Sequence, residues 1–178
     1  MSAHSPTRGI DHVGFTVPDL EAASRFFTEA FDAKTLYDGI KRTDQPFAGP
    51  KAEAMLGVPP DTVLVTMRMM QLGNGPGIEL FEMRCTDQRP AARPSDFGLQ
   101  HVAVYVDDID YAIQRFVSAG GTILAGKNEL LGLEKGKGNF WCYGRTPWGS
   151  VIELLSYPGP QEYEATTLLR RWTPVAAT

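Results

Sequence analysis

Apolar and polar residues alternate along two short stretches of the chain that share almost the same phrase. "GIDHVGFTVPDLEAA" begins at Gly9 and "GLQHVAVYVDDIDYA" begins at Gly98, and each has a histidine at its fourth position. An alternation of period two predicts a half-buried β-strand in each stretch. A second repeat links "GIELFEM" at Gly77 with "SVIELLSY" at Ser150. Self-similarity of this kind indicates a duplicated structural unit.

Each of the two opening strands is followed by apolar residues at helical spacing. "VPDLEAASRFFTEAF" predicts a helix that begins after Asp19 and continues to Phe31, and aspartate is a favourable N-cap. "DDIDYAIQRFVSAGG" predicts a second helix, capped by Asp107 or Asp108 and ended by the glycine pair at 120–121. Three β-rich pieces follow each helix, so each half of the chain predicts the order βαβββ.

These patterns predict an α+β protein built from two βαβββ modules. The expected segments are a flexible N-terminus (1–8), a first module (9–86) with an insertion (39–61), a linker (87–97), a second module (98–158) and a C-terminal tail (159–178). The insertion is expected to hold one short helix at 50–56. The tail, centred on 162–172, is expected to form an added helix with a packing or dimer-contact role.

Strand alternation separates the side chains that cover the core from those that can do chemistry. In the first strand Val13, Phe15 and Val17 are expected to pack on the helices, which leaves His12 on the other face. In the second strand the corresponding open face carries His101. The repeated acidic residues stand inside apolar runs, where an ionised carboxylate requires a cation or hydrogen bonds.

Four residues of ligand type thus occupy equivalent positions in the two modules: His12, Glu79, His101 and Glu153. Two imidazoles and two carboxylates suit one borderline divalent ion, such as Zn, Mn, Fe, Co or Ni, with positions open for water or substrate. Taken singly, either histidine is more simply read as a satisfied surface or core residue. The equivalence of the pairs favours a shared metal.

Further side chains could line a pocket around such an ion. The candidates are Met69, Phe81, Tyr105, Tyr143, Arg145 and Trp148. For each of them a packing role is the simpler interpretation, and Trp148 in "TPWG" is a candidate for fixing a turn. Cys142 is expected to pack rather than bind metal, and Glu82 is expected to face water.

Composition narrows the class of protein. The net charge of −4, the pI near 5.4 and the lack of a Lys/Arg cluster argue against nucleic acid as a partner. No apolar run approaches the length of a membrane span, and the start of the chain lacks the apolar core of a signal peptide. Two cysteines without a CxxC spacing fit a reducing cytoplasm. Exposed sheet edges also favour a homodimer.

The chain resembles the vicinal oxygen chelate superfamily, which includes glyoxalase, bleomycin-resistance and extradiol dioxygenase proteins. The resemblance covers about Gly9 to Pro158 and is carried by "IDHVGFTVPDLEAASRFF", "GIELFE", "LQHVAVYVDDID" and "TPWGSVIELLSYP". It implies two βαβββ modules that form a U-shaped, partly open β-barrel around a metal. The family's four metal positions fall on the four residues named above.

Within that superfamily the ligand pattern is most similar to glyoxalase I and to epimerase-type members. The carboxylate of Glu79 argues against the dioxygenases, because they generally bind iron through two histidines and one glutamate and have no ligand at that position. Gly14, Thr16 and Met83 stand where glyoxalase I has residues that serve glutathione, so glutathione is not favoured. The phrases around Glu79 and Glu153 look more like epimerases, including those that act on cyclitol ketones.

The resemblance and the ligand set together predict a metal-dependent isomerase or epimerase. The ion would chelate vicinal oxygens of a small carbonyl substrate, and a carboxylate would abstract a proton to give an enolate. Glu153 is the favoured base and Glu79 the symmetric alternative. Other candidates are a glyoxalase-type lyase, an extradiol dioxygenase and a non-catalytic protein that binds or sequesters a small molecule.

Overall fold

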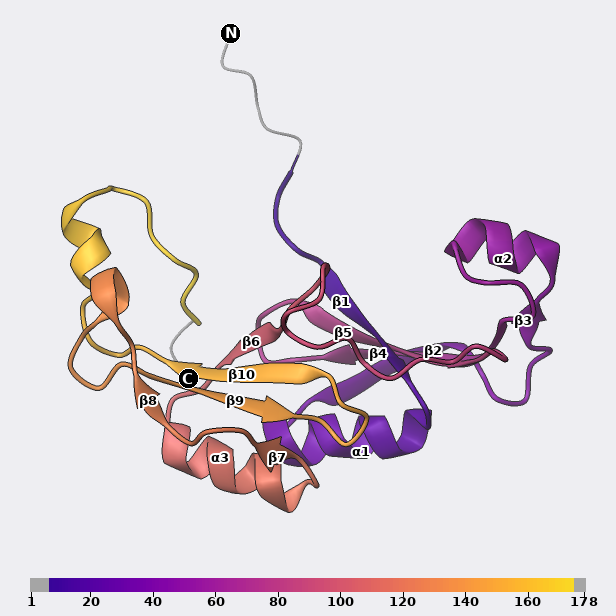
Figure 1. Ribbon diagram of the computed structural model, residues 1–178, viewed down its shortest axis with the longest axis horizontal. Coiled ribbons are helices and arrows are strands. Elements are labelled where there is room, and N and C mark those ends of the chain that lie inside the picture. The colour runs from indigo at the N-terminus through magenta and orange to yellow at the C-terminus, as the bar shows by residue number, and fades with distance from the viewer. Residues whose placement is uncertain (1–6, 175–178) are drawn as a thin grey trace, which may run out of the picture. The chain divides into compact units, whose positions relative to one another are not determined.

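The computed structural model describes residues 7–174, and they form two compact units of mixed α and β structure (Figure 1). Of the described residues, the first unit contains 7–20 together with 33–86. The second contains 21–32 and 87–174. The expected α+β class is confirmed. The expected flexible segment at 1–8 lies mostly outside the described residues.

The first unit is one open sheet with a short helix attached. Its strands lie in the order β1-β5-β4-β2, and β3 pairs with β4. β1 runs parallel to β5, and the other neighbours are antiparallel. The elements are β1 (His12–Val17), β2 (Lys34–Ile40), β3 (Phe47–Ala48), α2 (Pro50–Leu56), β4 (Val63–Gln71) and β5 (Gly77–Arg84).

The second unit repeats this sheet and adds two long helices. Its strands lie in the order β6-β10-β9-β7, with β6 parallel to β10 and β8 paired with β9. The helices are α1 (Leu20–Phe31, all but its first residue in this unit), α3 (Ile109–Ser118) and the 3-10 turns η1 (Gly132–Glu134) and η2 (Glu162–Ala165). The strands are β6 (Val102–Tyr105), β7 (Thr122–Ile123), β8 (Asn128–Glu129), β9 (Phe140–Arg145) and β10 (Val151–Ser156).

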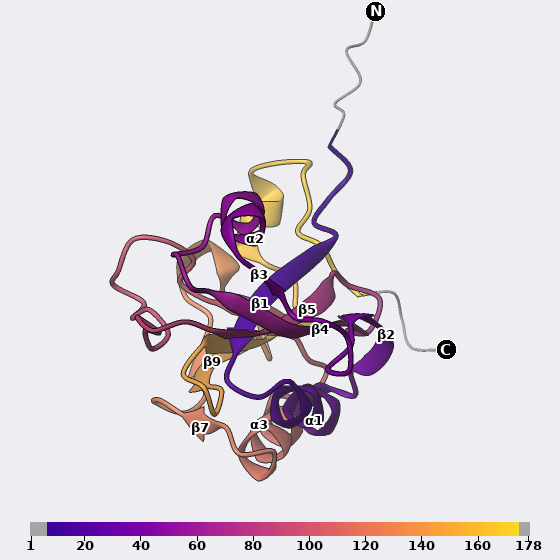
Figure 2. The same cartoon turned by 90° about the vertical axis from the view of Figure 1, so that its right-hand side faces the viewer.

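Helices α1 and α3 lie side by side and share an aromatic core (Figure 2). The rings of Phe26 and Phe116 meet edge to face at 5.2 Å, and Trp148 approaches Phe26 at 5.4 Å. Such edge contacts add to the burial of large apolar surface. Arg115 of α3 donates from Nε to the carbonyl oxygen of Glu29 at 2.8 Å. Helix α1 belongs to the first module in sequence but packs within the second unit. The sequence repeat alone does not predict this packing.

The helix starts follow the sequence closely. The Asp108 carboxylate accepts from the backbone N–H groups of Asp110 and Tyr111 at 3.0 Å, so Asp108, rather than Asp107, caps α3. The short helix in the insertion spans Pro50–Leu56, as expected, with proline in its first turn and Gly57 in the left-handed region at its end.

The expectation of an added helix in the tail is wrong for the described residues. In the described part of the tail the only helical element is the 3-10 turn Glu162–Ala165. A capping box between Gln161 and Glu164 stabilises the start of this turn. Two consecutive threonines follow that turn, and β-branched residues disfavour helix continuation. Within residues 7–174 no helix is both long and apolar enough to cross a membrane.

The expectation that Glu82 faces water is also wrong. Glu82 is 1% exposed, and its carboxylate accepts from Arg42, from Arg84 and from the backbone N–H of Leu20. The hydrogen bonds from Arg42 lower the pKa of Glu82 against the opposing effect of burial, which is the larger single influence. Its position follows from alternation in β5, because Ile78, Leu80 and Glu82 share the covered face.

Candidate functional site

The first unit brings His12 and Glu79 together on the open face of its sheet. In the parallel pairing of β1 with β5, His12 lies opposite Gly77 and Gly14 lies opposite Glu79. The covered face takes Phe15 and Val17, both buried, as alternation predicts. His12 Nε2 stands 3.1 Å from Glu79 Oε2, and the Glu79 side chain is only 15% exposed.

The second unit repeats the arrangement with His101 and Glu153. Ala103 lies opposite Glu153 in the parallel pairing of β6 with β10, as Gly14 does opposite Glu79. His101 Nε2 stands 2.9 Å from Glu153 Oε2, and the Glu153 side chain is 14% exposed. The duplicated phrases therefore produce duplicated pairs with nearly the same contact.

The other ring nitrogen of each histidine contacts the residue directly before it. His12 Nδ1 lies 2.8 Å from Asp11 Oδ2, and His101 Nδ1 lies 2.8 Å from Gln100 Oε1. Both partners are acceptors, so each Nδ1 carries the proton and donates. In a neutral ring Nε2 then presents a lone pair.

Each pair thus places a nitrogen lone pair against a carboxylate oxygen. Two acceptors at about 3 Å repel unless a proton or a cation lies between them. The hydrogen bond to Asp11 raises the pKa of His12, desolvation opposes this rise, and the charge of Glu79 adds a smaller rise. Burial raises the pKa of Glu153, while His101 lowers it. Both pairs are therefore sites of attraction for positive charge.

The donor set fits a divalent metal. Neutral imidazole bound through Nε2, with Nδ1–H held by a carboxylate or amide oxygen, is the usual arrangement of a metal-ligating histidine and its supporting residue. Within residues 7–174 no group of three or more His, Cys, Asp or Glu side chains is placed to hold an ion. Each unit contributes two candidate ligands, one histidine and one glutamate. Binding of one ion by all four residues stays a prediction.

Comparison with known proteins identifies the family. The family model described as "Glyoxalase/Bleomycin resistance protein/Dioxygenase superfamily" matches residues 11–136. The chain belongs to this superfamily. The resemblance seen in the repeated phrases is thereby confirmed. Its two-module fold is the framework that positions the two His–Glu pairs.

Relatives within the superfamily include an enzyme and solved structures. A 2-epi-5-epi-valiolone epimerase from Actinomyces sp is 34% identical over 166 residues, which cover 93% of this chain and 88% of the relative. A glyoxalase family protein from Bacillus cereus superposes with a TM-score of 0.65 at 23% identity, covering 89% of this chain and 99% of its own. A glyoxalase I mutant from Zea mays superposes with a TM-score of 0.56 at 18% identity, covering 82% of this chain and 44% of its own.

Four of the six residues expected near substrate lie beside the pairs. Met69 lies opposite Glu79, and Phe81 is two residues further along β5. Tyr143 lies opposite Glu153, and its ring stands 5.1 Å from that of His101. Tyr105 shares the face of Ala103, by alternation in β6.

The other two residues make structural contacts, although Arg145 shares the face of Tyr143 by alternation in β9, and a role for either toward a substrate stays a prediction. Arg145 donates from Nη1 to the carbonyl oxygen of Gly149 at 3.1 Å and so braces the turn between β9 and β10. Trp148 packs on α1 in the aromatic core, with ring distances of 5.4 and 5.7 Å to Phe26 and Phe27. Cys142 is buried, as expected, and burial raises the pKa of its thiol.

Several residues of the site were not found from the sequence. Asp11 and Gln100 could have been, because each stands directly before a repeated histidine. Trp141 and Tyr157 could also have been, because they share alternation with Tyr143 and Glu153. The tail residues that contact Tyr157 carry no such signal, since the path of the tail depends on tertiary contacts.

Proposed function

We propose that this chain is a divalent-metal-dependent epimerase that acts on a hydroxylated cyclic ketone. The proposal rests on the repeated contact of imidazole Nε2 with carboxylate Oε2, at 3.1 Å in the first unit and 2.9 Å in the second. The ion would be held by His12, Glu79, His101 and Glu153, and the proton would be moved by a carboxylate of the same set.

When bound, a divalent ion would polarise the substrate carbonyl and stabilise the negative charge that develops as the α-proton leaves. Glu153 would take that proton from the carbon next to the carbonyl, breaking the C–H bond. It would then return a proton to the opposite face of the same carbon, which inverts the centre without net change in composition. Asp11 and Gln100 would hold His12 and His101 in the orientation that presents Nε2.

The substrate class is proposed on the basis of the 34% identical relative, whose name assigns that relative to 2-epi-5-epi-valiolone. Similarity over 93% of this chain supports the same kind of substrate here, a ring that carries a ketone and several hydroxyl groups. Glu153 is favoured over Glu79 as the base because aromatic and hydroxyl-bearing side chains surround it. Glu79 instead lies opposite Met69, on a strand that also carries Met67 and Met70.

Solvent-deuterium exchange tests this proposal. Purified protein would be analysed for metal, treated with chelator, and reloaded singly with Zn, Mn, Fe, Co or Ni. Each form would then be incubated with 2-epi-5-epi-valiolone in deuterated water. We expect deuterium at one carbon next to the ketone, loss of exchange on chelation and recovery on reloading. Exchange that is unchanged after complete metal removal would reject metal dependence.

The same protein preparations, tested with other substrates, separate the alternative functions. A glyoxalase-type lyase would convert a glutathione hemithioacetal, and an extradiol dioxygenase would consume oxygen with a catechol. A binding protein would show affinity for the ring compound with no exchange. Turnover of either competing substrate without exchange into the cyclic ketone would replace the epimerase proposal.

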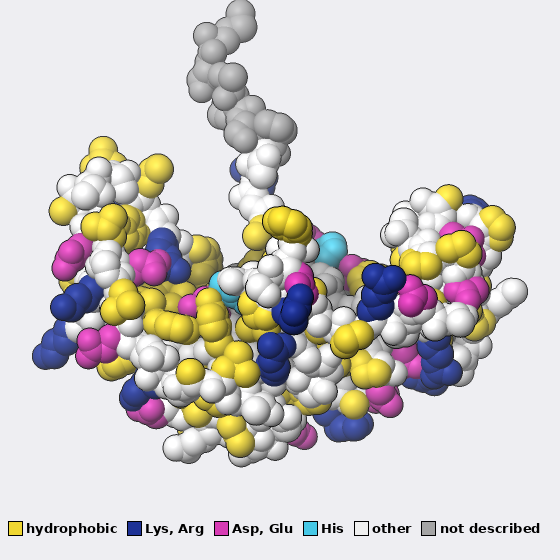
Figure 3. Space-filling model, in the orientation of Figure 1, with side chains coloured by type: hydrophobic (Ala, Val, Ile, Leu, Met, Phe, Trp, Pro, Cys, Tyr) yellow, Lys and Arg dark blue, Asp and Glu magenta, His cyan; other side chains and the backbone are white. Residues whose placement is uncertain are grey.

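We further propose that the protein is a homodimer. The tail of the second unit exposes large apolar side chains, with Leu168 at 96% and Leu169 at 78% exposure (Figure 3). Exposed apolar groups of this size in neighbouring positions are typical of surfaces that a partner covers. Sedimentation at micromolar concentration is expected to show a dimer, and a monomer would contradict the proposal.

A further inference from the structure

The face of the second unit that carries Glu153 has an aromatic floor. Alternation in β10 puts Glu153 and Leu155 on one face, and Tyr143 and Trp141 lie opposite them in β9. On the other side of β10, Tyr105 lies opposite Leu155. The rings of Trp141 and Tyr143 meet at 4.8 Å. A floor of this kind can stack against the C–H groups of a saturated ring.

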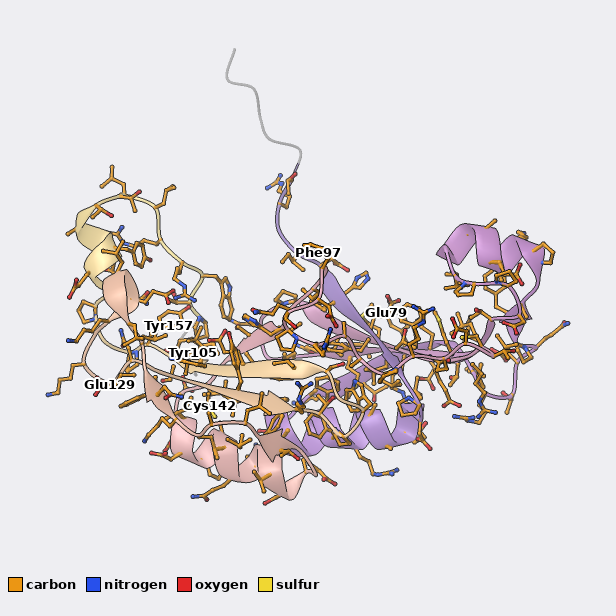
Figure 4. The ribbon with its side chains drawn as sticks, viewed as in Figure 1. Glu79, Phe97, Tyr105, Glu129, Cys142 and Tyr157 are labelled. Atoms are coloured by element: carbon orange, nitrogen blue, oxygen red, sulfur yellow. The ribbon has the colours of Figure 1, made fainter. Side chains whose placement is uncertain are left out.

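The floor ends in a wall formed by Tyr157, Glu134 and the part of the tail that returns to them. Tyr157 follows β10, and its ring stands edge-on to that of Tyr105 at 4.8 Å. Figure 4 places both tyrosines on the side of the sheet away from α3, and Cys142 on the side of α3. The Tyr157 hydroxyl donates to the carbonyl oxygen of Trp172, which ties the returning tail to the end of β10.

Arg171 stands in this wall and is held on three sides. Its guanidinium carbon lies 4.8 Å over the Tyr157 ring. Its Nη1 donates to Glu134 Oε1 at 2.5 Å, and its backbone N–H donates to the Tyr163 hydroxyl at 2.9 Å. The ring and carboxylate contacts fix the guanidinium, and the contact with Tyr163 fixes the backbone that carries it.

Polar groups on this face still have hydrogen-bonding capacity. Among the described residues, Arg171 uses one guanidinium nitrogen, Nη1, in a hydrogen bond, although guanidinium has five donors. The Tyr143 hydroxyl and the Trp141 indole N–H have no hydrogen-bond partner within residues 7–174. Neither group is among the buried polar atoms that lack a partner there. Each can therefore donate to a ligand oxygen.

The wall and Glu153 stand at the two ends of the same floor. Tyr157 follows the strand that carries Glu153, and Arg171, which is paired with Glu134, lies 4.8 Å over the Tyr157 ring. A ring compound that binds between the wall and Glu153 would contact both ends.

We propose that Arg171, with Glu134, determines substrate specificity by hydrogen bonding to ring hydroxyls of the substrate remote from the reacting carbon. Arg171 donates and Glu134 accepts, which matches a hydroxyl or a pair of adjacent hydroxyls. The aromatic floor contacts the C–H face of the ring, and Glu153 faces the carbon that exchanges its proton. This inference rests on the proposed function and names the groups that select a polyhydroxylated ring.

The kinetic test uses R171A and the matched variant R170A. Arg170 is the neighbouring tail residue with the same charge, but its nearest acidic partner is Glu164 at 3.9 Å rather than Glu134. For epimerisation of 2-epi-5-epi-valiolone, R171A should raise KM about 10- to 100-fold, the range for a lost hydrogen bond from a charged group. Its kcat should change much less, because binding remote from the reaction is lost equally in ground and transition states.

Further measurements separate recognition from damage to the fold. R171K should recover part of the loss in KM, since ammonium donates to hydroxyls but lacks the planar fork. R170A should behave as wild type, and all variants should match wild type in thermal unfolding and in bound metal. A KM for R171A equal to that of R170A, with wild-type turnover intact, would overturn the inference and leave the epimerase proposal standing. Wild-type protein that neither binds nor exchanges the compound would reject the proposed function and this inference with it.

Discussion

The His12–Glu79 pair and the His101–Glu153 pair share one backbone setting but have different neighbours. In both, a parallel strand pair puts a small residue, Gly14 or Ala103, opposite the glutamate. The surrounding positions differ in chemistry. Two positions beyond Glu79, the paired strands carry Phe81, Thr16 and Met67. Two positions beyond Glu153, they carry Leu155, Tyr105 and Trp141.

The difference shows which part of a duplicated unit is free to change. The His–Glu pair and the acceptor that supports its histidine are kept in both units, as the proposed metal would require. The residues two positions further along each strand can diverge without disturbing that geometry. Here divergence gives the second unit aromatic and hydroxyl-bearing groups, and for this reason we propose that the second unit carries the reacting side.

The largest effect is expected from exchanging each glutamate for glutamine. E153Q should lower deuterium exchange about 100- to 10,000-fold, the usual value of a general base, after normalisation to bound metal. E79Q should weaken metal binding to a similar degree but retain more of the normalised exchange. Equal residual rates in the two variants would remove the distinction between the pairs, and wild-type exchange in E153Q would eliminate Glu153 as the base.

Next in size are the residues that support the histidines. D11A and Q100A should each weaken metal affinity about 10- to 100-fold, as loss of such supporting contacts does. D11A should have the larger effect, because a carboxylate makes the histidine more basic than an amide does. Metal affinity measured by chelator competition checks this, with D11N as the variant that keeps a neutral acceptor. Unchanged affinity in both alanine variants would show that the Nδ1 contacts do not support metal binding.

A smaller effect on stability distinguishes Glu82 from Ser156, which occupies the equivalent position in β10. E82Q should lower the free energy of unfolding by about 1–3 kcal/mol, because a buried charge-assisted network is lost. S156A should lower it by no more than about 1 kcal/mol. Urea unfolding at neutral pH measures both, and equal losses would deny the network a special role.

The pH dependence of that loss follows from the lowered pKa of Glu82. The stabilisation is fully present above the carboxyl's unfolded pKa of about 4.3 and is lost as pH falls through the lower folded value. The difference in unfolding free energy between wild type and E82Q should therefore shrink in acid. A difference that grows as pH falls would contradict the ionised network.

The smallest effect concerns the cap of α3. D108A should cost about 1 kcal/mol of stability, because two backbone N–H groups at the helix start lose their acceptor. D107A is the matched control, since the adjacent Asp107 carboxylate does not cap the helix. Thermal unfolding of the two variants compares them, and equal stability would show that the cap contributes little.

The sequence predicts most of this fold because the repeat states its elements twice. Alternation around His12 and His101 defines the covered and open faces, and helical spacing locates α1 and α3. Local turn residues identify the short helix in the insertion. All of these signals are local, and the structure agrees with them.

The remaining features depend on contacts between residues far apart in sequence. Alternation alone places Glu82 on the covered face. A buried carboxylate there needs a cationic partner, and that partner is Arg42, which lies 40 residues earlier in the chain. The packing of α1 with α3 and the course of the tail to Tyr157 likewise have no local signal. The contacts of Arg171 with Glu134 and Tyr157 could not be predicted for the same reason.

Metal stoichiometry in single histidine variants tests the central claim most directly. If the two pairs hold one ion, wild-type protein should bind one divalent ion per chain, and H12A and H101A should each lose most of it. Elemental analysis after dialysis against a single metal measures this without any substrate. Two ions per wild-type chain, or a full complement retained by either variant, would contradict a shared ion.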